Sequence, residues 1–210
     1  MHTPNRSASG GRVRLTVLIA LLVAVTMGPV DNAAAAPYTS HFDELITELE
    51  SRSAALQGST SKADVKRRKG LDKVLEAFAK TSKGPDHDLK VAAKAAKALA
   101  KLYPDELVPQ DGDAEGATLH DLVELALARC DGDIRSLALA AQAVVNSAPA
   151  GKCKARDKAQ AALDDITAQL SALSGLPSLA HVATGLGKAH KRAVQAQGLA
   201  GKALGCAPDR

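Results

Sequence analysis

The chain has 210 residues, of which 46% are hydrophobic, and 27 Lys and Arg face 23 Asp and Glu, a formal net charge of +4. This near balance excludes a chain drawn as a whole to nucleic acid, so no specific nucleic-acid partner is expected. With no Trp, two Tyr and two Phe, the chain also has too few aromatic rings for a surface that stacks bases or sugars.

The first 35 residues have the order of regions that is typical of an export signal. Arg6, Arg12 and Arg14 precede an apolar run over residues 15–25, and small residues follow at 33–36. The apolar run is shorter than the about 20 residues that a membrane helix needs. These residues therefore predict a cleaved signal peptide over 1–35.

Cleavage is expected after Ala35, with Ala36 as the alternative site and an uncleaved anchor as the alternative outcome. Three arginines and Asp31 lie in this segment, so its removal leaves two net positive charges. We expect a secreted or periplasmic domain of roughly 175 residues, without a transmembrane segment after cleavage.

Three helices are expected within residues 36–103. Ser40 reads as the cap of the first, which ends near Gly58, and Ser61 as the cap of the second, which stops before Gly84. The third is expected to begin at Asp86 or Asp88 and to end at Tyr103. Its inward residues repeat at helical spacing, and four lysines occupy the opposite stripe.

Residues 104–117 carry two Pro, two Gly and five acidic residues, which predicts a loop that divides the chain. Asp111, Asp113, Glu115 and Gly116 match the first positions of a calcium loop. Leu122 stands where that loop needs its last carboxylate, so a solvated acidic loop is favoured over weak calcium binding.

Four helices are expected within residues 118–210. Thr118 caps one that ends at Cys130, and a tight turn over residues 131–133 leads into the next. Residues 152–206 then show the 3.5-residue spacing of small and apolar side chains that favours a closely packed antiparallel hairpin. The predicted fold is therefore all-α, an up-down bundle of about seven helices with a C-terminal helical hairpin.

The three cysteines predict one disulfide, because an exported chain meets an oxidising compartment. Cys153 begins one arm of the hairpin and Cys206 ends the other, so antiparallel packing places them at the same end. Cys130 is the alternative partner of Cys153, and a buried free thiol is its expected state otherwise.

A basic patch is expected where the second and third helices lie side by side. Such a patch would meet an anionic surface, such as lipid head groups or acidic polysaccharide, while a solvated helix surface is the plainer interpretation. Its residues are Lys62, Lys66, Arg67, Arg68, Lys69, Lys90, Lys94, Lys97 and Lys101.

No catalytic, cofactor or metal motif is found. The histidines form no HExxH pattern, and Gly185 to Lys188 lack the residues that a phosphate loop requires. We therefore expect no enzyme, no cofactor and no metal site, although a site assembled from distant helices stays a weaker alternative.

Two functional hypotheses follow. The first is an exported, non-enzymatic bundle that acts through an unidentified protein partner or as an envelope component. The second is a binder of anionic surfaces through the basic helices of residues 62–101.

Overall fold

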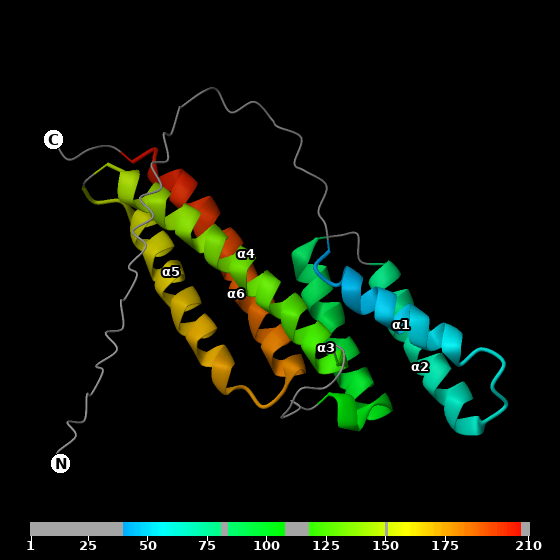
Figure 1. Ribbon diagram of the computed structural model, residues 1–210. Coiled ribbons are helices and arrows are strands. Elements are labelled where there is room, and N and C mark those ends of the chain that lie inside the picture. Colours follow the sequence, from blue (N-terminus) through cyan, green and yellow to red (C-terminus); the bar gives the residue numbers. More distant parts are fainter. Residues whose placement is uncertain (1–39, 81–83, 108–117, 150, 207–210) are drawn as a thin grey trace, which may run out of the picture. The chain divides into compact units, whose positions relative to one another are not determined.

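The computed structural model describes residues 40–80, 84–107, 118–149 and 151–206. These residues form six α-helices and two short 3₁₀ helices, and no strand occurs among them (Figure 1). The all-α fold and its packed C-terminal helices agree with the sequence prediction. The predicted signal peptide and the calcium-loop positions Asp111, Asp113, Glu115 and Gly116 lie outside the described residues.

The first three helices are α1 (Asp43–Ala55), α2 (Lys62–Ala79) and α3 (Pro85–Leu102). Ser61 is the N-cap of α2, as predicted, but Ser40 does not cap α1. The Ser40 hydroxyl accepts a hydrogen bond from Phe42 N and donates one to Asp88, which ties the start of α1 to α3.

α3 begins at Pro85, before both of the predicted starts, Asp86 and Asp88. Gly84 takes a φ of 103° at its N-cap, and Pro85 occupies the first helical position. Proline suits this position because its fixed φ is helical and the missing N–H would have no partner there.

The fourth helix, α4 (Leu119–Ser147), is one continuous helix of 29 residues. The predicted tight turn at residues 131–133 is wrong, because Gly132 has no positive φ and the helix passes through it. Ile134 is buried on the same helix as Cys130, so packing on both sides of Gly132 supports helical backbone.

The predicted C-terminal hairpin is confirmed by α5 (Lys154–Ala172) and α6 (Leu179–Ala203), which pack against each other. A 3₁₀ turn (Leu173–Gly175) connects them, and a second one (Pro104–Glu106) follows α3. Arg192 of α6 donates a hydrogen bond to Asp165 of α5 at 2.8 Å, an exposed link between the two arms.

α6 is the central helix, because α3, α4 and α5 all pack extensively against it. Its buried positions are mostly alanine, and small side chains allow neighbouring helix axes to approach closely. The buried alanines of α6 are Ala180, Ala183, Ala189, Ala193, Ala196, Ala200 and Ala203.

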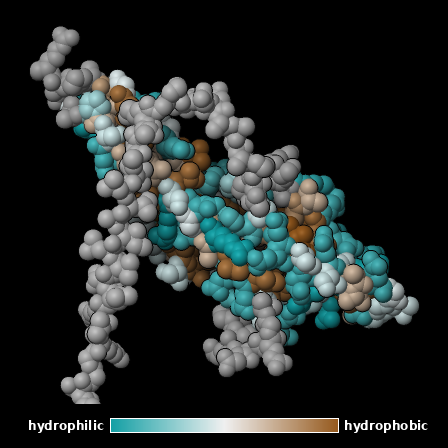
Figure 2. All heavy atoms as spheres, turned by 45° about the horizontal axis from the view of Figure 1, so that its top comes forward, coloured by the Kyte–Doolittle hydropathy of each residue, from teal (hydrophilic) through white to brown (hydrophobic). Residues whose placement is uncertain are grey.

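Figure 2 shows hydrophobic residues reaching the surface in small patches between hydrophilic ones. Among the described residues, the most exposed large apolar side chain is Leu139 of α4, at 71%. None of the described helices has the combined length and apolar character that crossing a membrane requires.

Candidate functional site

A cleft of about 900 Å³ opens between α3, α4 and the connection from α5 to α6. The C-terminal half of α3 and the N-terminal half of α4 form one side of its lining. The end of α5, the turn at residues 173–178 and the start of α6 supply the other. The cleft therefore exists because the hairpin connection and the two other helices meet at one end of α6.

The lining of the cleft is mainly apolar. Leu127, Leu170 and Leu186 line it and are buried, and Leu176, at 36% exposure, also lines it. The further apolar residues of the lining are Ala96, Ala100, Leu107, Ala128, Leu173, Pro177, Leu179, Ala180 and Val182.

Charged side chains line part of the cleft. Arg135 donates to Asp131 at 2.8 Å, so these two charges neutralise each other. Lys97 and Lys101 of α3 are exposed and form no ion pair with a described residue. The lining thus combines apolar side chains with two lysines that form no ion pair with a described residue.

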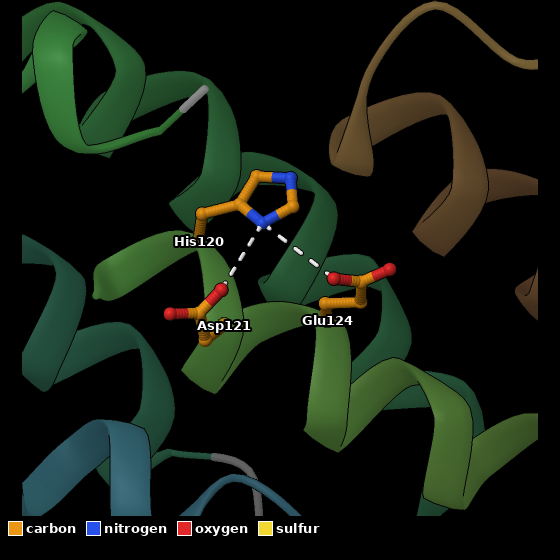
Figure 3. A group of neighbouring side chains, drawn as sticks. All are labelled: His120, Asp121 and Glu124. Carbon is orange, nitrogen blue, oxygen red and sulfur yellow. Dashed lines mark ion pairs between the residues drawn. The ribbon is translucent and has the colours of Figure 1, made fainter. Parts of the chain in front are cut away.

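His120, Asp121 and Glu124 form a polar cluster in the first turns of α4 (Figure 3). His120 is 8% exposed, and its Nδ1 lies 3.7 Å from Asp121 Oδ1 and 3.6 Å from Glu124 Oε2. These distances are too long for hydrogen bonds, and Nδ1 is buried without a hydrogen-bond partner among the described residues. His120 and Glu124 also line the cleft.

A capping box positions Asp121. Its Oδ2 accepts hydrogen bonds from the Thr118 backbone N–H at 2.9 Å and from the Thr118 hydroxyl at 2.8 Å. The Thr118 backbone and side-chain donors hold the pKa of Asp121 below its usual range. The carboxylate is therefore charged at neutral pH, with Oδ1 directed towards His120 (Figure 3).

The predicted basic patch divides into a lysine face on α2, a lysine stripe on α3, and two arginines of α2, Arg67 and Arg68. On α2, Lys62, Lys66 and Lys69 occupy the face opposite the buried residues Leu71 and Phe78. The guanidinium carbon of Arg67 lies 5.9 Å from the ring centre of Tyr103, and that of Arg52 lies 5.1 Å from the same ring centre. Arg67 thus belongs to the contact between α2 and the end of α3.

On α3 the four lysines form one exposed stripe, of which the C-terminal half reaches the cleft. None of the nine residues of the patch forms an ion pair with a described residue. The members on α3 are Lys90, Lys94, Lys97 and Lys101.

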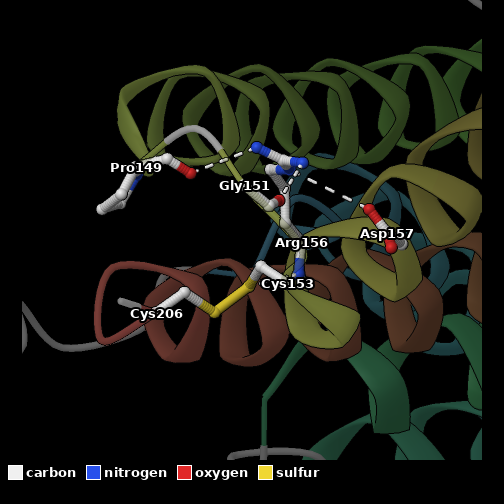
Figure 4. Close-up of a disulfide and its surroundings, with 6 residues drawn as sticks. All are labelled: Pro149, Gly151, Cys153, Arg156, Asp157 and Cys206. Carbon is white, nitrogen blue, oxygen red and sulfur yellow. Dashed lines mark hydrogen bonds and ion pairs between the residues drawn. A yellow bond between two sulfur atoms is a disulfide. The ribbon is translucent and has the colours of Figure 1, made fainter. Parts of the chain in front are cut away.

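The predicted disulfide between Cys153 and Cys206 is present, with a Cα–Cα distance of 5.9 Å (Figure 4). It joins the N-cap residue of α5 to the turn that follows α6. Arg156 donates to the carbonyl oxygens of Pro149 and Gly151 at 3.1 and 2.7 Å and so secures the preceding loop. Closure of this 53-residue separation stabilises the fold by about 4 kcal/mol in the chain-entropy model.

Cys130, the alternative partner, is a buried free thiol at 4% exposure. It lies within continuous α4, so the predicted end of a helix at Cys130 is wrong. Burial, together with the nearby charges of Asp133 and Asp88, raises the pKa of this thiol to about 12.

Two further polar contacts connect distant helices. His190 of α6 is 9% exposed, and its Nδ1 lies 2.8 Å from Asp86 of α3. His41 Nε2 lies 2.6 Å from Asp133 of α4. Both contacts join residues that are far apart in the sequence, so the sequence by itself does not predict them.

No family model matches the sequence, no curated protein matches it, and no solved structure matches the fold. The cleft and its chemistry therefore carry the functional argument.

Sequence reasoning missed both the cleft and the polar cluster. The cluster has a local signal, since His120, Asp121 and Glu124 occupy positions i, i+1 and i+4 of a helix. The HExxH pattern does not detect it, because that pattern requires two histidines and this cluster has one. The cleft has no local signal, since four separate helices form it.

Proposed function

We propose that the protein is an exported, non-enzymatic helical domain that binds an anionic amphiphile, a molecule with an apolar chain and a negatively charged head group. The observation that carries the proposal is the apolar cleft of about 900 Å³ with Lys97 and Lys101 on one side. Its volume falls in the range of ligand sites in proteins, roughly 300–1,000 Å³.

The apolar lining of the cleft supports binding of the hydrocarbon chain. Leu127, Leu170 and Leu186 are buried there, and an acyl chain laid against them would lose contact with water. Each methylene group removed from water contributes about 0.8 kcal/mol. Contact with the apolar chain would therefore supply most of the affinity.

The two lysines support selection of an anionic head group. Glu124 and Asp131 also line the cleft, but Arg135 already pairs with Asp131. Among the described residues, the lining contains three basic and two acidic side chains, one net positive charge with histidine neutral. An anionic head group is therefore favoured beside Lys97 and Lys101.

Export is supported by the sequence of residues 1–35 and by the disulfide. Disulfides persist in oxidising compartments and are rare in the cytosol, so the bond between Cys153 and Cys206 is compatible with an extracytoplasmic location. N-terminal sequencing of the protein recovered outside the cytoplasm tests this part of the proposal. A first residue of Ala36 or Pro37 is expected, and a retained Met1 would contradict cleavage.

Displacement of a fluorescent fatty acid by hexadecanoate and by hexadecanol tests ligand binding. We expect K97A/K101A to weaken hexadecanoate about ten-fold, the equivalent of 1.4 kcal/mol, and to leave hexadecanol unchanged. The matched control is K90A/K94A, which removes two lysines of the same stripe outside the cleft. Equal losses in both double variants, or no saturable displacement at all, would overturn the proposal.

A second pair of variants tests the apolar part of the cleft. Leu176→Asp places a charge at its lining and should weaken both the acid and the alcohol. Leu139→Asp is the control, because this exposed residue does not line the cleft. Equal effects of the two substitutions would indicate non-specific binding to exposed apolar surface.

The second candidate function is binding of the basic patch to an anionic membrane surface. Its specific support is that none of the nine basic side chains forms an ion pair with a described residue, and only Arg67 among them contacts an aromatic ring of the described residues. Juxtamembrane basic residues attract anionic lipid by about 1 kcal/mol each. A protein partner stays a prediction from sequence.

Co-sedimentation with vesicles of anionic lipid across a salt series measures this second function. Binding should weaken as salt rises and should fall in K62A/K66A/K69A, which leaves the cleft intact. If this triple variant sediments like the unmodified protein, the α2 face is not the membrane contact.

A further inference from the structure

His120 carries a buried nitrogen for which the described residues supply no hydrogen bond. Its Nδ1 points towards two carboxylate oxygens at 3.6 and 3.7 Å (Figure 3). A buried polar atom is costly to leave unsatisfied, so a group that binds between these three atoms would stabilise the arrangement.

The separations suit ligands that share one metal ion. Nitrogen and oxygen ligands lie about 2.0–2.2 Å from zinc, which places two tetrahedral ligands about 3.3–3.5 Å apart. The three potential ligand atoms lie within 4.8 Å of one another. Small rotations of the exposed Glu124 side chain would bring its oxygen into coordination distance.

We propose that His120, Asp121 and Glu124 form a binding site for a divalent transition-metal ion, with Zn²⁺ as its best-matched occupant. His120 would bind through Nδ1, Asp121 through Oδ1 and Glu124 through one carboxylate oxygen. One imidazole and two carboxylates favour zinc over Mg²⁺ and Ca²⁺, which prefer oxygen ligands throughout. The proposal does not depend on amphiphile binding.

The local sequence orients these three side chains towards one another. Asp121 uses Oδ2 for the capping box with Thr118, which leaves Oδ1 available on the side of His120. Glu124 lies one helical turn after His120, so both side chains project on the same face. Three protein ligands leave at least one coordination position for water or a ligand in the cleft, which His120 and Glu124 line.

Two effects compete with metal binding at this position. The positive end of the α4 dipole disfavours a cation in the first turn, but the two carboxylates supply two negative charges against it. A proton on Nδ1 is the other competitor, since a protonated His120 would form ion pairs with the same carboxylates. The experiment must therefore distinguish zinc from a proton.

Isothermal titration of the full chain with Zn²⁺, together with ¹⁵N spectra of the histidine side chains, makes this distinction. We expect a Zn²⁺ site with a stoichiometry of one whose saturation shifts the His120 Nδ1 resonance. Glu124→Gln should weaken this site at least ten-fold, and His120→Ala should abolish it. Because Glu124 is exposed at 65% of its side chain, its variant should fold normally.

Two control variants remove a carboxylate and an imidazole at positions outside the proposed metal site. Glu50→Gln changes an exposed carboxylate of α1, and His181→Ala changes an exposed histidine of α6. Both should retain the unmodified affinity and the His120 shift. Absence of the Nδ1 shift at saturating Zn²⁺, or equal affinity in Glu124→Gln and the unmodified protein, would overturn the proposal.

Discussion

Cys130 shows how burial controls the chemistry of a single residue. Its side chain is 4% exposed within α4, and its pKa is raised to about 12 by burial and by the charges of Asp133 and Asp88. The thiolate is the reactive form of cysteine, and it is scarcely populated at neutral pH in this environment. Cys130 is therefore a packing residue in the folded chain.

Alkylation and the pH dependence of unfolding test this description. Native Cys130 should react with iodoacetamide at least ten-fold more slowly than in urea, measured by mass spectrometry. Since the folded pKa of about 12 exceeds the ordinary 9.0, the thiol's contribution to stability is complete below pH 9 and declines from pH 9 towards 12.

Cys130→Ala should therefore lose less stability than the unmodified protein between pH 8 and 10.5. The comparison removes the effects of lysine and tyrosine titration, which both proteins share. Identical slopes of the free energy of unfolding against pH would contradict the raised pKa.

At the scale of elements, α4 shows how tertiary packing overrides a local turn signal. Asp131, Gly132 and Asp133 are typical of a turn, yet they lie in a 29-residue helix. Cys130 and Ile134 are buried on either side of this sequence. Burial of that stripe outweighs the roughly 1 kcal/mol by which glycine disfavours a helix interior.

Gly132→Ala should therefore raise the free energy of unfolding by about 0.5–1 kcal/mol in urea titrations. A Cβ atom at this position would meet nothing within 4 Å, so no clash offsets the gain. Gly58→Ala is the control and should destabilise, because Gly58 has a φ of 82°. Destabilisation by Gly132→Ala would indicate a turn rather than a continuous helix.

At the scale of the whole described domain, α6 organises the packing because it contacts three other helices through small residues. Ala193 and Ala196 are fully buried, and each contributes little apolar area. Close approach of the helices compensates by bringing more backbone and side-chain atoms into contact. Such an interface tolerates little increase in side-chain volume.

Ala193→Leu should accordingly lower the free energy of unfolding by about 1–3 kcal/mol through overpacking. Val194→Leu is the matched control. Val194 follows Ala193 in α6, and its side chain is 50% exposed, so a larger side chain can extend into solvent. Equal stability of the two variants in urea would show that α6 is less closely packed than described.

The disulfide acts on the domain as a whole by constraining the unfolded chain. Cys153→Ser combined with Cys206→Ser should lower the free energy of unfolding by about 2–4 kcal/mol. The unmodified protein measured in reductant should show the same decrease. An unchanged urea midpoint under both conditions would mean that the bond makes no contribution to stability.

Local patterns in the sequence were sufficient to predict the all-α fold, the C-terminal hairpin and the Thr118 cap, because each depends on residues close together in the chain. The pairing of Cys153 with Cys206 also followed, since two antiparallel helices return to the same end. The turn at residues 131–133 and the cap at Ser40 were wrong, because contacts with distant residues outweigh these local signals.

The cleft, the contact of His190 with Asp86 and the central position of α6 were decided only by the tertiary structure. The physical reason is that each depends on which helix faces pack together, and the periodicity of one helix does not name its neighbour. The cluster around His120 was determined partly by the sequence and partly by the tertiary structure. The spacing of His120 to Glu124 is visible in the sequence, but the burial of Nδ1 depends on the packing around α4.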